Sequence, residues 1–189
     1  MNNKTFNLQR AKISDVPEIH KLINRFAAMG EVLPRSLSEL YENVRDYVVV
    51  KDSEDQLAGC AALHVVWEDL AEIKAVAVAE EWQSKGLGAY LVTSRIEEAK
   101  EMGIATAFLL THKPTFYEKL GFTPVDVMSL PRKVWGECMR CPKFPACNEI
   151  AMVVHLTPEG AASLQSPQSN NAGAWEVPMM TPFSRPPMV

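Results

Sequence analysis

The chain has 189 residues, a formal net charge of -4 at pH 7 and four cysteines. This length can bury a core without disulfides, and the mildly acidic balance argues against a polybasic surface that binds nucleic acid or an anionic membrane. No apolar run reaches the roughly 18 residues of a membrane-spanning helix, and residues 1–5 lack the apolar centre of a signal peptide. We therefore expect a cytoplasmic protein without membrane or nucleic-acid partners, whose cysteines are reduced thiols or metal ligands.

The first part of the chain predicts one strand followed by two helices. Residues 6–12 alternate apolar and polar side chains, as in a half-buried strand. A Ser-Asp pair followed by Pro17 is typical of a helix start, and this helix is expected to run to about Met29, where Gly30 ends it. Three- and four-residue spacing gives it one apolar face, formed by Val16, Ile19, Ile23 and Phe26. Residues 36–39 form a possible capping box for a second helix, which contains Leu37, Leu40 and Val44.

A strand meander follows and leads into a glycine-containing turn. We expect strands over residues 47–50, 57–67 and 70–78, the last two joined as a hairpin by a short acidic turn. Glycines lack Cβ, so a turn that contains them can approach an anion closely, and the unpaired N–H groups of the next helix start favour phosphate. The turn therefore predicts a pyrophosphate cradle, made of Gln83, Ser84, Lys85, Gly86, Leu87, Gly88 and Ala89.

The helix after this cradle is expected to end at Gly103. Its apolar face is predicted from Gly88, Val92, Ile96 and Ala99, which leaves Arg95 and Glu98 elsewhere on the helix. The remaining elements are a buried strand, a short helix stopped by a glycine and two more strands, at residues 106–111, 114–120, 123–127 and 149–156. Ser, Asn, Gln and Pro accumulate beyond them, so we expect one domain at residues 1–156 and a mostly disordered tail at 157–189.

Two of these segments resemble a known superfamily. Gln83-x-x-Gly86-x-Gly88 after an apolar strand, and residues 115–122 further on, resemble the two core motifs of the GNAT superfamily of N-acetyltransferases. The resemblance covers residues 6–156. It implies an α/β fold with a mixed central sheet flanked by helices, and acetyl-CoA as co-substrate without any required metal. Since GNAT domains often pair, a homodimer is compatible with it.

Within the superfamily, residues 59–64, 70–78 and 121–126 look like the acetyltransferase domain of bacterial N-acetylglutamate synthases of the short, stand-alone type. This implies acetylation of the α-amino group of an amino acid, most simply L-glutamate in the first step of arginine biosynthesis. Two alternatives stay open. The acceptor could be glutamine, another amino acid, a polyamine or a protein N-terminus, or the chain could be a non-catalytic acyl-CoA-binding or thiol-sensing module.

The resemblance also implies roles for particular residues. Backbone groups of Val76, Ala77 and Val78 would pair with the pantetheine arm, and Tyr117 occupies the place where GNAT enzymes commonly keep a tyrosine near the coenzyme sulfur. Such a phenol, with an ordinary pKa of about 10, can protonate the leaving thiolate at neutral pH. The alternative is a tyrosine that only packs on the core.

The acceptor side is assigned less directly. The period of two along a strand puts Glu72, Lys74 and Val76 on one face, where Glu72 is a candidate base. Lys74 and Arg35, the latter in a Leu33-Pro-Arg35 connector that resembles the family's glutamate-binding segment, are candidates for binding carboxylates. His112 is a second candidate base. The alternatives are a plain Glu72–Lys74 ion pair and a solvated loop histidine.

The cysteines near the predicted last strand form the remaining motif. Cys138-x-x-Cys141 followed by Cys147 supplies three thiols, whereas a closed zinc site needs four ligands. We expect a packed or redox-sensitive thiol cluster without metal. In the zinc alternative, the fourth ligand would be Cys60, His112 or His155.

Overall fold

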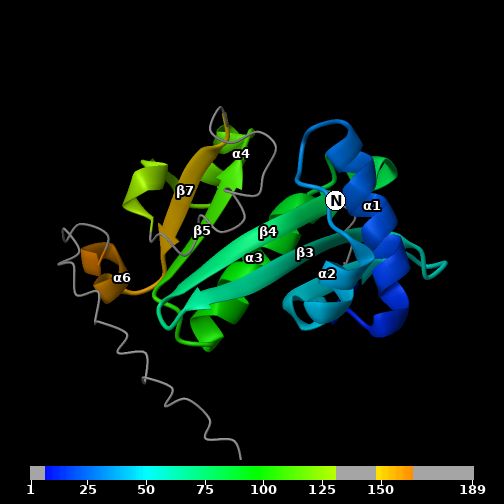
Figure 1. Cartoon of the computed structure of the whole chain (residues 1–189), viewed down its shortest axis with the longest axis horizontal. Coiled ribbons are helices and arrows are strands. Elements are labelled where there is room, and N and C mark those ends of the chain that lie inside the picture. Colours follow the sequence, from blue (N-terminus) through cyan, green and yellow to red (C-terminus); the bar gives the residue numbers. More distant parts are fainter. Residues whose placement is uncertain (1–6, 131–147, 164–189) are drawn as a thin grey trace, which may run out of the picture.

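The computed structural model describes residues 7–130 and 148–163, and it places them in one mixed sheet flanked by helices (Figure 1). The sheet has seven strands in the order β1-β2-β3-β4-β5-β7-β6. The strands are β1 (Asn7–Arg10), β2 (Tyr47–Lys51), β3 (Leu57–Trp67), β4 (Leu70–Val78), β5 (Thr106–Thr111), β6 (Thr123–Val125) and β7 (Ile150–His155). The helices are α1 (Val16–Ala28), α2 (Leu37–Glu42), α3 (Leu87–Glu101), α4 (Pro114–Glu118) and α6 (Pro158–Ser163).

The sheet consists of two antiparallel halves joined by one parallel pair. Strands β1 to β4 pair antiparallel in chain order, and β5, β7 and β6 form the second antiparallel group. Strands β4 and β5 are parallel, and a parallel connection requires a crossover, which α3 supplies. Helices α1 and α2 cover one face of the first half, and α3 covers the opposite face (Figure 1).

Each helix buries its apolar stripe against the strands that it covers. The stripe of α1 includes four buried residues, Val16, Ile19, Ile23 and Phe26, as their spacing predicts. On the other face, Leu87, Leu91, Val92 and Ile96 of α3 pack against β3 and β4. The predicted GNAT architecture, a mixed central sheet flanked by helices, is therefore confirmed.

Some expectations about local structure were wrong. Val44 lies in a 3₁₀ turn, Val44–Asp46, rather than in the second helix, and a second turn, Val127–Ser129, follows β6 where we expected strand. Arg95 does not lie outside the apolar face of its helix but is 4% exposed. Its guanidinium pairs with Glu98, which also accepts from Arg10 at 2.9 Å, so the buried cation is compensated.

The described structure also continues past residue 156. Backbone N–H groups of Leu156 and Thr157 donate to the Ala105 carbonyl at 2.8 and 3.4 Å, and α6 follows. A Cβ at Gly160 would collide with that same carbonyl, so a glycine is required for this close approach. The segment expected to be a tail thus begins with a docked helix, and residues 164–189 lie outside the described part.

No helix among the described residues is both long and apolar enough to span a membrane.

Candidate active site

A β-bulge in β4 organises the site. Cys60 of β3 is opposite Ala77, but Ala62 is opposite Lys74, so β4 holds one additional residue in this interval. Ala75 has φ of 52°, a left-handed conformation that a non-glycine residue adopts only when its surroundings impose it. The bulge resets the alternation of side chains along the strand.

The reset corrects the prediction that Glu72, Lys74 and Val76 share one face. Ala62 lies opposite Lys74 and packs in the core beneath α1, whereas Val76 packs with the residues that contact α3. Val76 therefore faces α3, opposite to Lys74. A strict period of two cannot anticipate this, because a bulge depends on the register with the neighbouring strand.

Next to the bulge, β4 and β5 separate. Within the described residues their pairing is limited to three positions, Leu70–Glu72 against Thr106–Phe108, although β5 continues beside β7 to Thr111. The gap opens into a cleft of about 640 Å³. Its lining comes from five places: residues 73–78 of β4, the turn and helix start at 83–89, residues 110–113 at the end of β5 and just after it, Phe116 and Tyr117 of α4, and Phe26 of α1 with residues 30–32 that follow the helix.

The end of the cleft at α3 has the properties of an anion cradle. Gly86, with φ of 85°, is the residue before α3, and Ser84 is also left-handed with φ of 58°. A Cβ on Gly88 would lie 3.5 Å from Phe116 Cζ, an ordinary contact, so the protein's own packing does not require glycine there. The missing Cβ leaves room in the cleft instead.

Most residues predicted for the cradle line the cleft, with two exceptions. Gln83, Ser84, Gly86, Gly88 and Ala89 are among the lining residues. Leu87 is instead buried against β2 and β3, and the Lys85 ammonium lies 5.2 Å from the Trp82 ring centroid and donates to the Glu81 carbonyl.

The edge of β4 offers backbone groups to the gap. Ala79 N–H donates to Ala58 O at 2.9 Å, and hydrogen-bonded pairs alternate along an antiparallel ladder, so Val78 turns its own N–H and C=O away from β3. Gln83 Nε2 donates to the Val78 carbonyl from that side at 3.1 Å. By the same alternation, Ala77 turns its backbone toward Cys60 and away from the gap.

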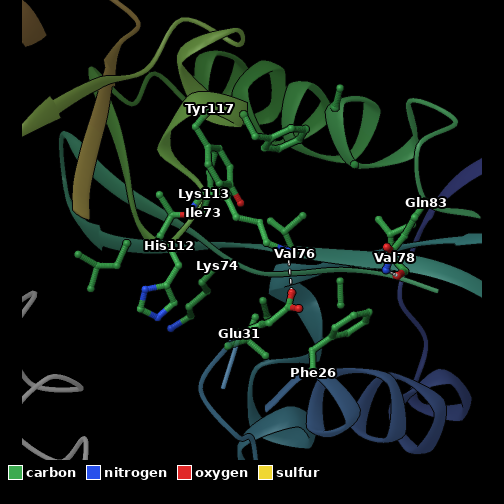
Figure 2. Close-up of a pocket in the computed structure, with 18 of the residues that line it drawn as sticks. Phe26, Glu31, Ile73, Lys74, Val76, Val78, Gln83, His112, Lys113 and Tyr117 are labelled. Carbon is green, nitrogen blue, oxygen red and sulfur yellow. Dashed lines mark hydrogen bonds and ion pairs between the residues drawn. The ribbon is translucent and has the colours of Figure 1, made fainter. Parts of the chain in front are cut away.

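Tyr117 lies on the α3 side of the gap (Figure 2). Its ring packs edge-on against Phe116 and Phe122, with centroid separations of 4.9 and 5.8 Å. Burial raises the pKa of the phenol to about 12. The hydroxyl is therefore protonated at neutral pH and can donate a proton into the cleft.

The α1 side of the gap carries charged groups (Figure 2). Lys74 lines the cleft, and its Nζ lies 3.5 Å from Glu72 Oε2; both side chains are largely buried, at 12% and 16% exposed. His112 also lines the cleft, with Nε2 3.6 Å from Glu149 Oε1. Glu72 itself is absent from the described lining.

An ion pair that no sequence motif predicts crosses the cleft. Lys113 Nζ lies 2.7 Å from Glu31 Oε2, and both residues belong to the lining (Figure 2). Glu31 follows α1 and Lys113 follows β5, so 82 positions separate them along the chain. No local motif could reveal this pair, because only the order of the strands brings the two loops together.

The connector residues Leu33 and Arg35 lie outside the described cleft lining. Asn24 holds the connector, accepting from the Arg35 N–H at 3.2 Å and donating to the Arg35 carbonyl at 2.8 Å. The predicted role of Leu33 and Arg35 in binding the acceptor stays a prediction.

The predicted thiol cluster, Cys138, Cys141 and Cys147, lies outside the described residues. Cys60 is fully buried, and burial raises its pKa to about 12. Its thiol donates to the Ala75 carbonyl at 3.7 Å, so Cys60 serves the core rather than a reactive or metal site. Among the described residues, no group of three or more metal-binding side chains comes together.

A family model matches this arrangement. The model of the acetyltransferase (GNAT) family matches residues 16–122, more than half of the chain. The chain belongs to the acetyltransferase (GNAT) family. The prediction of an acetyl-CoA-dependent N-acetyltransferase is thereby confirmed at the level of the family.

Individual relatives are similar over most of the chain. An uncharacterized N-acetyltransferase of Chlorobaculum tepidum is 35% identical over 149 residues, which are 79% of this chain and 96% of that protein. An amino-acid acetyltransferase of Mycobacterium tuberculosis is 34% identical over 136 residues, which are 70% of this chain and 77% of that protein.

Two solved structures have folds similar to that of this chain. N-acetylglutamate synthase of Neisseria gonorrhoeae, complexed with coenzyme A and N-acetyl-glutamate, has a TM-score of 0.75 and 25% identity, covering 82% of this chain and 36% of that chain. A Mycobacterium tuberculosis protein in complex with CoA and NLQ has a TM-score of 0.70 and 28% identity, covering 80% of this chain and 99% of that chain.

Proposed function

We propose that this protein transfers the acetyl group of acetyl-CoA to the α-amino group of an amino acid, with L-glutamate as the preferred acceptor, and so makes N-acetylglutamate for arginine biosynthesis. One observation carries the proposal: the cleft passes through the sheet between β4 and β5, with glycines and Tyr117 on the α3 side and charged groups on the α1 side. Two substrates can then meet in the gap from opposite faces.

The α3 side fits acetyl-CoA. Gly86 and the first N–H groups of α3 suit the pyrophosphate, and the space beside Gly88 accommodates it without a Cβ. The Val78 carbonyl, which accepts from Gln83 at 3.1 Å, would accept from a pantetheine amide instead. The thioester would then lie near the bulge.

The chemistry then needs few groups. The acceptor amine attacks the thioester carbonyl carbon, the new C–N bond forms, and the C–S bond breaks. A backbone N–H of β4 in the gap stabilises the oxyanion, and Tyr117 donates its proton to the departing thiolate. The raised pKa of Tyr117 keeps that proton available throughout the neutral range.

The acceptor preference rests on charge. Lys74 presents a largely buried ammonium to the cleft on the acceptor side, which favours an acceptor that carries carboxylates over a polyamine. Leu33 and Arg35 would have to move toward the cleft to contribute. The names of the amino-acid acetyltransferase and N-acetylglutamate synthase relatives support the same acceptor class.

The test is coenzyme A release from acetyl-CoA across a panel of L-amino acids with glutamate, glutamine and aspartate, plus spermidine. We expect saturable turnover with glutamate. The Lys74→Met variant should raise the glutamate KM by about tenfold or more, since a charge-assisted contact of roughly 1.5–3 kcal/mol is lost.

Lys119→Met is the matched control, because Lys119 is an exposed lysine outside the cleft. Its kinetics should equal those of the wild type. Preference for spermidine, or no turnover with any amino acid, would contradict the proposed function.

A further inference from the structure

The end of the β5–β7 ladder juxtaposes a histidine and a glutamate at the cleft. Thr111 pairs with Ile150 as the last position of this antiparallel register, so the residue that follows β5 and the residue that precedes β7 are neighbours. These are His112 and Glu149, with Nε2 and Oε1 3.6 Å apart. Their side chains are 25% and 14% exposed, so the pair is partly shielded from water.

The pair lies on the α1 side of the gap, the side that the proposed function gives to the acceptor. Glu72 is in register with Phe108, and the period of two places Leu110 and His112 on the same face as Phe108. Figure 2 shows His112 together with Lys74 on the α1 side of β4, and Tyr117 on the opposite side. A group that removes a proton from the attacking amine has to be on the amine's side.

Resting on the function proposed above, we propose that His112 is the catalytic base that takes the proton from the acceptor's ammonium group, and that Glu149 is its positioning residue. The Nε2 atom is turned to Glu149, which leaves Nδ1 to accept the proton. Catalytic hydrogen bonds are often long before substrates bind, and 3.6 Å is consistent with that.

This assignment replaces the predicted base, Glu72. The Glu72 carboxylate lies 3.5 Å from the Lys74 ammonium and is outside the described cleft lining, so it holds Lys74 in place rather than meeting the amine. His112, in contrast, is itself a lining residue.

Among the residues that the structure describes, six charged or titratable groups besides His112 lie along this part of the site. They are Glu149 before β7, Glu72 and Lys74 of β4, Glu31 after α1, Lys113 after β5, and Tyr117 of α4.

The proton balance closes. The ammonium gives one proton to His112 and becomes the amine, which forms the C–N bond as the C–S bond breaks. Tyr117 gives its proton to the thiolate. The tetrahedral nitrogen releases its remaining extra proton to water, Tyr117 regains one from water, and His112 returns its proton to water, so one proton is released per turnover.

The experiment measures kcat/KM against pH for the wild type, His112→Gln and Glu149→Gln with acetyl-CoA and glutamate. At pH 7, His112→Gln should lose about 100-fold, the lower range for a general base. The deficit should shrink as pH rises toward the pKa of the free acceptor amine, because more acceptor then arrives unprotonated. Glu149→Gln should show a smaller loss than His112→Gln, with the same recovery as pH rises, because a misplaced His112 also matters less when the acceptor arrives unprotonated.

His155→Gln is the matched control, because His155 lies at the other end of β7 with Nδ1 3.2 Å from Thr106 Oγ1. It should keep the wild-type profile. A wild-type profile for His112→Gln, or a high-pH rescue in Glu72→Gln instead, would overturn the assignment to His112 while leaving the proposed function intact. A wild type that acetylates no amino acid would overturn both.

Discussion

The two sides of the cleft are formed by different kinds of chemical group. On the α3 side, the site consists of glycines, backbone groups and a phenol kept protonated by burial, all within residues 76–117. On the α1 side it consists of charged side chains from four separate segments, such as Lys74 of β4 and Glu149 before β7. A universal co-substrate can be bound by local geometry, whereas a particular acceptor requires charges placed by the whole fold.

The largest expected effect belongs to the α3 side. Tyr117→Phe should lower kcat by about 100-fold, as expected for loss of a general acid, with KM for acetyl-CoA nearly unchanged. Because burial raises the pKa of Tyr117 to about 12, the wild-type kcat should show no alkaline loss from this group up to pH 10. Steady-state kinetics across pH 6–10 check both points, and an unchanged kcat removes Tyr117 from the acid role.

The next prediction concerns a larger side chain at Gly88, in the space proposed for the pyrophosphate. Gly88→Val should raise the acetyl-CoA KM by about tenfold or more, since overpacking costs roughly 1–3 kcal/mol, while the glutamate KM stays the same. For Gly88→Ala the melting temperature should remain near the wild-type value, because a Cβ at this position makes only an ordinary 3.5 Å contact.

Gly88→Ala is the control for that variant and should bind acetyl-CoA more nearly normally. If Gly88→Val instead raises the glutamate KM and leaves that of acetyl-CoA, the two sides of the cleft are assigned the wrong way round.

Substitution of Asp15, which precedes α1 and pairs with Lys51 of β2, should have the smallest effect on catalysis and a clear effect on stability. Asp15 is buried, accepts from the Lys12 N–H at 2.7 Å and lies 2.9 Å from Lys51 Nζ. Burial alone would raise the pKa of Asp15, but the Lys12 hydrogen bond and the Lys51 ammonium together lower it below its ordinary 3.8. Asp15→Asn should destabilise the protein by about 1–3 kcal/mol at pH 7.

The sign of the pH dependence follows from the lowered pKa. The contribution of Asp15 is fully present above pH 3.8 and is lost as pH falls through the folded-state pKa, so the difference between wild type and variant should shrink there. Urea denaturation at pH 7, 4 and 3 measures this. Asp55→Asn is the control, because Asp55 also contacts Lys51, at 3.3 Å, but is 83% exposed and should matter little. Equal losses in both variants would contradict the argument.

The sequence by itself determined most of the elements, and it located the glycine turn and Tyr117 on the α3 side of the site. The β-strands, the amphipathic α1 and the turn around Gly86 are encoded by residues adjacent in the chain, and the family resemblance rests on the same contiguous segments. Even the burial of Arg95 had a local signal, since it follows Leu87 and Leu91 at four-residue intervals.

Only the tertiary structure decided the α1 side. The bulge at Ala75 reversed the direction of Val76 because it depends on pairing with β3, and the separation of β4 from β5 depends on sheet order. The same order set Glu149 beside His112, though 37 positions separate them in the numbering (149 − 112). Contacts between residues distant in the chain leave no local pattern, so the sequence could name Lys74 and His112 as candidates but could not show that His112 lies beside Glu149.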